Sequence, residues 1–488
     1  MARISPVPRG ILVAILLVGV LDLLAATDGK IDRFVSEEME LNGIPGLSLV
    51  IVESGTVAYL KAYGVRSVQS QEAMRTETPV ELASLSKALT ALAVLRLERD
   101  GLVERDSSVT ALLPDLDRAR WRGVTIRNLL QHRSGLRRKH DFLMPCCGQP
   151  GQLDLSGAAP RFAGADLKSP PGERSSYANS NYVLLAAIVQ RASGTPFPEF
   201  MRKEIFQTLG MDRTTVDEGE AQSWGEAAPH EWQWGRVGIS PSRFLGWYGS
   251  SLVKASATDM SKYMEALLDP QPADNGTRLP HGAWWELLEG NYDLGWAVQA
   301  EAEWLGGEYV LEHTGKLWGG STAIVLAPRR RNGVAVLANL GSSRAGPVAR
   351  AILRSLEGSP LPRPERISRG EIPDTWAMIF LASSVGVLLV ILGRALSVGR
   401  QVRRGARAWR PTIWRSARAA VLSGLAVYLI HGLLWGTDPP REALPTTIRT
   451  ALPALVASVI GLLLLAAVTG LVPKRGRQSE GARDPHPC

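Results

Sequence analysis

Three short segments, far apart in the chain, hold residue types that together can carry out acyl transfer. Ser84 and Lys87 lie three residues apart at the start of an almost wholly apolar helical pattern, so they share one face of a buried helix. Burial and the positive end of the helix dipole both lower the pKa of a lysine, and a neutral lysine can take a serine's proton. Ser84 is therefore a candidate nucleophile and Lys87 its base. The alternative is that Ser84 only caps the helix.

The second segment is Tyr177-Ala-Asn179, an extended polar stretch directly before another apolar helical pattern. Residues two apart in an extended chain point to the same side. A phenol can relay a nucleophile's proton, and an amide can hold a substrate carbonyl. The alternative is that Asn179 or Ser180 caps the following helix.

The third segment is His313-Thr314-Gly315-Lys316, which continues an apolar strand pattern. A glycine on a strand edge lets a ligand approach the backbone closely. The backbone N–H of Lys316 can then form half of an oxyanion hole.

Hydrophobic periodicity predicts the elements that position these segments. Strands are expected at 46–52, 56–60, 309–311, 321–326 and 333–337, and helices between them at 82–99, 125–131, 182–192 and 256–268. We therefore expect an α/β (α+β) domain over residues 27–360. Its central antiparallel sheet is built from both ends of the domain and flanked by helices, with an inserted helical region.

The two ends of the chain predict export and membrane attachment. Residues 1–26 place Arg3 and Arg9 before a short apolar run and small residues, as in a signal peptide or N-terminal anchor. Residues 361–372 are expected to be a linker and residues 373–488 a membrane domain with transmembrane helices 376–392, 419–435 and 451–472.

Charge gives the expected orientation. The loop 394–418 carries eight arginines and no acid, so the positive-inside rule places it and the C-terminus in the cytoplasm and the catalytic domain outside. Residues 373–488 hold 14 Lys/Arg against 5 Asp/Glu, so the net charge of +8 belongs to this tail. The remainder is nearly neutral, and no nucleic-acid partner is expected.

The ordered set Ser84-Leu-Ser-Lys87, Tyr177-Ala-Asn179 and His313-Thr-Gly315 resembles the class C β-lactamase-like serine hydrolases, which include D-Ala-D-Ala carboxypeptidases, D-aminopeptidases and esterases. The segment 125–136 resembles the family's "LLxHxSGL" helix. The resemblance implies that Ser84 forms an acyl-enzyme and that Lys87 and Tyr177 share the work of the base. It also implies a substrate-binding role for Asn179, an acyl pocket lined by His313–Gly315, and an oxyanion hole from the Ser84 and Lys316 N–H groups.

One departure affects the expected substrate. The β-lactamases proper carry a lysine where this chain has His313, which is mostly neutral at pH 7. This favours an ester, peptide or cell-wall-related amide without a free carboxylate, in a small-molecule or peptide substrate. No metal or organic cofactor is implied, since the sequence contains no cluster of ligand residues. The alternatives are a true β-lactamase or D-Ala-D-Ala carboxypeptidase, and an acylatable sensor signalling through the membrane helices.

Overall fold

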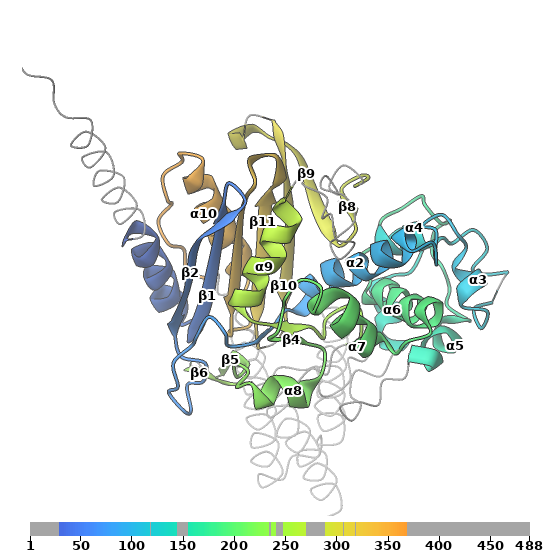
Figure 1. Ribbon diagram of the computed structural model, residues 1–488, viewed down its shortest axis with the longest axis horizontal. Coiled ribbons are helices and arrows are strands. Elements are labelled where there is room, and N and C mark those ends of the chain that lie inside the picture. The colour runs from blue at the N-terminus through green and yellow to red at the C-terminus, as the bar shows by residue number, and fades with distance from the viewer. Residues whose placement is uncertain are drawn as a thin grey trace, which may run out of the picture. The chain divides into compact units, whose positions relative to one another are not determined.

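A seven-stranded sheet lies at the centre of the domain (Figure 1). The computed structural model describes residues 29–367 except 118, 144–154, 234–235, 241–246, 270–287, 306 and 318. The strands of the sheet are β1 (Gly46–Glu53), β2 (Thr56–Gly64), β8 (Tyr292–Asp293), β9 (Trp296–Ala302), β10 (Glu308–Lys316), β11 (Ser321–Ala327) and β12 (Asn332–Ala338). Their order is β2-β1-β12-β11-β10-β9-β8, and each neighbouring pair is antiparallel.

The two ends of the domain meet in the middle of this sheet. Strand β1 pairs with β12 from Leu47↔Ala338 to Val52↔Gly333, although the two strands are almost 300 residues apart in sequence. The expectation of a central antiparallel sheet assembled from both ends is therefore confirmed.

Both faces of the sheet are covered, which explains why its strands are continuously apolar rather than alternating. Ile324 and Leu326 of β11 belong to one core cluster, together with helix α9 (Ala257–Leu268). Ala323 and Val325 point the other way, into a second cluster with helix α10 (Ala345–Leu356) and the N-terminal helix, which is described over residues 29–42. Figure 1 shows α9 and α10 on opposite faces.

The inserted region between β2 and β8 holds most of the remaining elements. Helix α2 packs against α6 at its centre, and the small sheet β3-β7-β4 lies beside them. The elements are β3 (Val80–Glu81), η1 (Ala83–Leu85), α2 (Ser86–Arg99), α3 (Val109–Leu112), α4 (Ile126–Leu130), η2 (Arg138–Leu143), η3 (Leu155–Gly157), α5 (Ala158–Phe162), α6 (Asn179–Ser193), α7 (Phe197–Phe200), η4 (Met201–Phe206), β4 (Thr214–Thr215), α8 (Glu218–Ser223), β5 (His230–Gln233), β6 (Arg236–Ile239) and β7 (Lys254–Ala255). Two short 3-10 turns, η6 (Glu303–Leu305) and η7 (Pro328–Arg330), flank β10 and β11.

The expected helices are present, with one difference of consequence. Ser256 caps α9 by accepting a hydrogen bond from the Asp259 N–H at 3.1 Å, as the sequence predicts. The pattern over residues 82–99, however, begins as the 3-10 turn η1 and becomes α-helical only at Ser86. Ser84 therefore lies in a tight turn ahead of the helix rather than in its first α-helical turn.

The expected fold class is corrected in its C-terminal part. No helix among the described residues is long and apolar enough to cross a membrane. Helix α6, with 15 residues, falls short of the ~20 residues that a span requires. A C-terminal segment of three transmembrane helices is thus not supported. The segments 376–392, 419–435 and 451–472, like residues 1–26, lie outside the described residues.

A buried ion pair ties the N-terminal helix to the start of α10. Glu38 and Arg344, which are 1% and 9% exposed, are joined by two hydrogen bonds of 2.6 and 3.1 Å. Asn42 donates to Glu38 at 2.9 Å and accepts from the Ile367 N–H at 2.6 Å. The chain after α10 is thus fastened to the N-terminal helix as far as residue 367; the linker at 361–372 stays a prediction.

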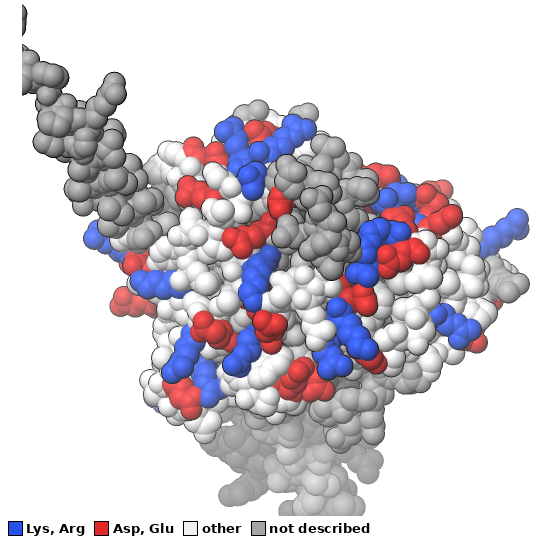
Figure 2. Space-filling model, viewed as in Figure 1, with Lys and Arg blue, Asp and Glu red and all other residues white. Residues whose placement is uncertain are grey.

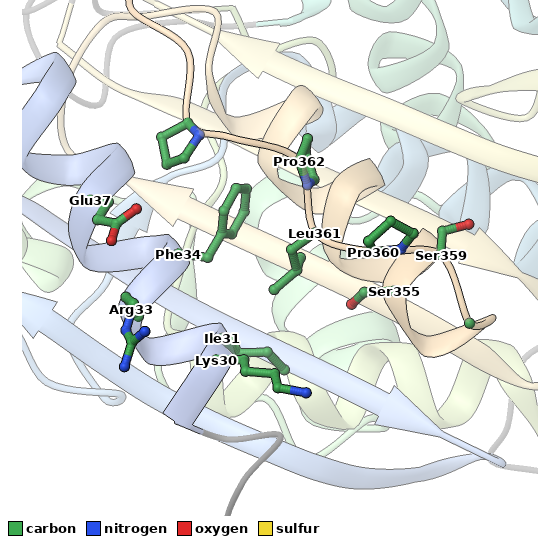
Figure 3. Close-up of a pocket in the computed structure, with 12 residues that line it drawn as sticks. Lys30, Ile31, Arg33, Phe34, Glu37, Ser355, Ser359, Pro360, Leu361 and Pro362 are labelled. Carbon is green, nitrogen blue, oxygen red and sulfur yellow. The ribbon is translucent and has the colours of Figure 1, made fainter.

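A cavity of about 590 Å³ lies beside this network, between the N-terminal helix and the segment after α10 (Figure 3). Phe34 and Leu361 both belong to, or pack against, the α10-side core cluster, so the cavity opens on that side of the sheet. Side chains that line it are Lys30, Arg33, Phe34, Glu37, Leu361 and Pro362.

On the face shown in Figure 2, basic and acidic side chains of the described residues are interspersed, without the continuous basic surface that nucleic acids bind.

We predict that Glu38→Ala lowers the free energy of unfolding by about 3–5 kcal/mol, because it leaves the buried Arg344 guanidinium without its main partner. Urea unfolding at pH 7 measures this. The matched control is Glu199→Ala, which breaks a surface pair with Lys203 (2.6 Å, side chains 39% and 55% exposed) and should cost no more than ~1 kcal/mol. Equal losses in the two variants would contradict the prediction.

Candidate active site

Ser84 lies in the turn η1, and the residue before this turn, Leu82, is held by two hydrogen bonds. The Leu82 N–H donates to Val253 O at 2.8 Å, and Thr322 Oγ1 of β11 donates to Leu82 O at 2.8 Å. Ala83 has a φ of 53°, in the left-handed region that costs a non-glycine residue of order 1 kcal/mol. The strained turn holds Ser84 beside β10 ahead of helix α2.

Lys87 is completely buried and surrounded by oxygen atoms. Its Nζ lies 3.1 Å from Ser84 Oγ and 2.8 Å from Asn179 Oδ1. A third acceptor, the Ser250 carbonyl, lies 2.9 Å away. Burial lowers the pKa of Lys87 to about 7, although the nearby Asp141 carboxylate acts in the opposite direction.

These three contacts assign a direction to the lone pair of neutral Lys87. A neutral amine has two N–H donors and one lone pair. Asn179 Oδ1 and Ser250 O can only accept, so they occupy the two donors. The lone pair then faces Ser84 Oγ, the one partner that can donate. The arrangement can remove the proton of Ser84.

Tyr177 and Asn179 both reach this centre, as their spacing predicts. The Tyr177 ring centroid lies 4.9 Å from Lys87 Nζ, and its hydroxyl forms a hydrogen bond with Ser84. The ring edge is open, with 42% of the residue exposed, whereas burial around the hydroxyl raises the pKa of Tyr177 to about 12. Tyr177 is therefore a protonated phenol at neutral pH.

The possibility that Asn179 or Ser180 caps α6 is not what the structure shows. The residue before the helix is Ala178, which offers no side-chain cap. Asp141 of η2 caps the helix instead, since its Oδ1 accepts from the Ser180 N–H at 2.8 Å and from Ser180 Oγ at 2.5 Å. The Asn179 side chain is thereby left for Lys87.

His313 lies next to this centre and is buried. Its Nδ1 is hydrogen-bonded to the Gly295 carbonyl, in the turn between β8 and β9. Burial, and then the charge of Lys87, lower the pKa of His313 to about 3. His313 is therefore a neutral ring at physiological pH and not a cation.

Gly295 lets this β8–β9 turn approach α2. Its φ is +81°, and a Cβ atom at this position would lie 2.5 Å from Ala88 Cα and 2.6 Å from Ala88 N. Only glycine allows the carbonyl that holds His313 to lie so close to the helix that carries Lys87.

The remaining residues of the strand segment divide between its two faces. Gly315 faces η1, where an added Cβ would collide with the Leu82 carbonyl and Thr322 Oγ1. The close approach at Gly315 is therefore made by the protein itself, not by a ligand as the sequence suggested. The Thr314 side chain lies against Gly346 of α10, and Lys316, two residues on, shares that face by strand alternation.

The open edge of β10 is the part that faces the site. In the described pairings β9 accompanies β10 only as far as Glu312↔Ala297, whereas β11 continues to Lys316↔Ser321. The backbone of residues 313–316 is thus paired on one side only, and an extended chain could add to the other.

His132 and Ser134, which invite comparison with a second serine–histidine pair, do not bond to each other. Ser134 Oγ donates to Asn181 Oδ1 at 2.6 Å, and Asn181 Nδ2 lies 2.9 Å from His132 Nδ1. All three side chains are buried, and burial lowers the pKa of His132 well below its usual range. Their geometry is that of a structural network under Tyr177.

Three contributors were missed from the sequence: the Ser250 carbonyl, Asp141 and Gly295. A backbone carbonyl has no residue-type signal, and Asp141 lies in an irregular turn without periodicity. The dipeptide Leu294-Gly295 between two short strands was the only available signal for the β8–β9 hairpin. Among the described residues, no group of three or more His, Cys, Asp or Glu side chains is placed to hold a metal ion.

Known proteins resemble this chain in sequence and in fold. Protein flp of Staphylococcus aureus strain MRSA252 is 23% identical over 466 residues, covering 90% of this chain and 91% of flp. The octameric penicillin-binding protein homologue from Pyrococcus abyssi has 26% identity and a TM-score of 0.58, covering 72% of this chain and 81% of that one. The beta-lactamase/D-alanine carboxypeptidase from Pseudomonas syringae, at 20% identity and a TM-score of 0.58, covers 69% of this chain and 100% of its own and shows likeness of fold alone.

The Beta-lactamase family itself matches residues 31–357, about two thirds of the chain. This range contains the sheet, the inserted helical region and all of Ser84, Lys87, Tyr177, Asn179 and His313. The chain therefore belongs to the Beta-lactamase family and is a serine hydrolase.

Proposed function

We propose that the protein hydrolyses an ester, peptide or cell-wall-related amide bond through an acyl-enzyme on Ser84. The observation that carries this proposal is the buried Lys87 Nζ, 3.1 Å from Ser84 Oγ and with a pKa of about 7. A lysine in this state is half neutral at physiological pH, which is what a general base requires.

In the first half of the proposed reaction, Lys87 takes the Ser84 proton as Oγ attacks the substrate carbonyl carbon. Tyr177, with a pKa of about 12, holds its proton at neutral pH and is suited to pass it to the leaving group. The ammonium of Lys87 then gives its proton to Tyr177, which restores the starting protonation state of both residues. The products of this half are the Ser84 ester and the protonated leaving group; water then hydrolyses the ester.

The charge that develops on the substrate oxygen is proposed to be held by the backbone N–H groups of Ser84 and Lys316, each worth a few kcal/mol in the transition state. The open edge of β10 at 313–316 supports pairing with an extended substrate. Because the Thr314 side chain faces α10 and Gly315 packs against η1, the strand would contribute through its backbone and through His313.

The proposed substrate class follows from the charge state of His313. A strand position that carries a lysine would attract a substrate carboxylate, whereas a buried, neutral imidazole with its Nδ1 bonded to Gly295 offers no positive charge. This favours acyl donors that have no free carboxylate at that position.

We predict that a p-nitrophenyl ester gives an acyl adduct on Ser84 of the purified protein, detected by mass spectrometry of its peptides. Ser84→Ala should abolish the adduct, while Ser176→Ala, at a nearby serine outside the proposed machinery, should retain it. The same proteins are incubated in parallel with a fluorescent penicillin. Penicillin labelling with turnover would favour a β-lactamase or carboxypeptidase, and stable labelling without turnover a sensor. An adduct on another residue would contradict the proposal.

We predict that the rate of Ser84 acylation rises with pH through about 7, because only deprotonated Lys87 can accept the proton. Lys87→Met should reduce kcat/KM by about 10²–10⁴-fold at pH 8. A pH-independent rate between pH 5.5 and 8.5 would rule out Lys87 as the base.

The same depressed pKa predicts a stability effect with a defined sign. Between pH 7 and 10.5 the unfolded chain keeps the Lys87 proton that the folded protein has lost, so the free energy of unfolding of the wild type should rise over this window. Below pH 7 both states are protonated and the full burial cost remains. Lys87→Met should lack the rise and be more stable than the wild type at pH 6 by a few kcal/mol, as measured by urea unfolding.

We also propose that the catalytic domain works outside the cytoplasm, on the basis of the signal-like sequence of residues 1–26. Protease added to intact cells should then degrade the domain, while a cytoplasmic marker protein survives. Degradation only after cell lysis would contradict this location.

A further inference from the structure

We propose that Asp141 is a positioning residue of this site, which holds Asn179 against Lys87 by capping α6 from outside and supplies the counter-charge of Lys87. The proposal rests on the function proposed above for Ser84 and Lys87. The hydrogen bonds of Asp141 are with Ser180 and not with Ser84, so Asp141 acts through its neighbours.

Asp141 caps the N-terminus of helix α6. Helix α6 begins at Asn179 with no side-chain cap of its own, because Ala178 precedes it. Asp141 is 4% exposed and accepts from the Ser180 N–H and hydroxyl at 2.8 and 2.5 Å, and also from the Asn179 N–H. A carboxylate at this end also meets the positive pole of a 15-residue helix. The start of α6 is therefore fixed by η2.

The cap leaves the Asn179 side chain free to contact Lys87. Asparagine at the start of a helix readily turns its side chain back to the backbone N–H groups. Here the Ser180 N–H bonds to Asp141 and the Asn181 N–H bonds to the Ala178 carbonyl, and Asn179 Oδ1 accepts from Lys87 Nζ at 2.8 Å. That contact occupies one of the two donors of neutral Lys87 and so helps to aim its lone pair at Ser84.

Asp141 also affects the charge state of Lys87. The titratable groups around Lys87 come from four elements and their flanks: Asp141 of η2, His132 after α4, Tyr177 and Tyr182 at α6, and His313 of β10. Burial lowers the pKa of both histidines and raises the pKa of both tyrosines, so all four are neutral at pH 7.

Asp141 is the one carboxyl group in this set, so its ionised form is the source of negative charge beside Lys87. Burial raises its pKa, but the hydrogen bonds from Ser180 and Asn179 favour its ionised form. Its negative charge raises the pKa of Lys87 against the larger effect of burial. Asp141 thereby limits how far the base is weakened.

The test is the pH profile of Ser84 acylation by p-nitrophenyl acetate in Asp141→Asn. The amide oxygen can still accept from the Ser180 N–H, but the charge is gone. The pKa of Lys87 should therefore fall, and the low-pH limb of the profile should move to lower pH by about one unit. Asp141→Ser, whose hydroxyl can also cap, removes the same charge and is the second variant should the first not fold.

Asp141→Ala separates the two roles. It removes the cap as well, so acylation should fall at least about tenfold at every pH, including pH 9, where Lys87 is fully neutral. The matched control is Asp293→Asn, at another buried carboxylate, which accepts from the Gln131 amide and the Leu294 N–H. Its low-pH limb should coincide with that of the wild type.

In the acylation assay, the proposal would be overturned by a profile of Asp141→Asn that coincides with the wild type, or by a limb that shifts equally in Asp293→Asn. The charge coupling can also be read without substrate. In urea unfolding, the rise of stability with pH should begin at lower pH in Asp141→Asn than in the wild type. Failure of Ser84 to be acylated in the wild type would refute the proposed function, whereas an unchanged unfolding profile would refute the role of Asp141.

Discussion

The site depends on the burial of one ammonium group. Removing Lys87 from water disfavours its charged form more strongly than the nearby Asp141 favours it, and the net effect lowers the pKa of Lys87 from 10.5 to about 7. The same lysine on a hydrated surface would be protonated at pH 7 and unable to accept the Ser84 proton. Helix α2 is apolar on nearly every side for this reason, and Ser86, Lys87 and Thr90 are its fully buried polar exceptions.

The buried Lys87 can act on Ser84 only if both residues keep their positions, and several contacts around η1 and α2 hold them in place. The Thr322 hydroxyl holds Leu82 just before the nucleophile, and Gly315 allows β10 to touch the same carbonyl. Gly295 brings the β8–β9 turn against the backbone of α2. These contacts join the sheet to the inserted region at the one place where the reactive groups meet, so the central sheet determines the geometry of a site that lies mostly on helices.

Much of this organisation could be predicted from the sequence, because continuous apolar strands and a capped helix at Ser256 are local signals. The triad of segments around Ser84, Tyr177 and His313 was also recognisable from residue types and order. Strand alternation alone could have shown that Thr314 and Lys316 face away from His313 and Gly315. Asp141 could not have been found, since its role depends on a tertiary contact between an irregular turn and the start of a distant helix.

The neutral state of His313 has a consequence beyond substrate charge. A lysine at the same buried position would add a second cation near Lys87, and each charge would lower the pKa of the other. With a neutral imidazole bonded to Gly295, one carboxylate is enough to balance one ammonium. The neutral side chain at position 313 and the presence of Asp141 on η2 are therefore parts of one electrostatic arrangement, in which Lys87 is the buried group that titrates near pH 7.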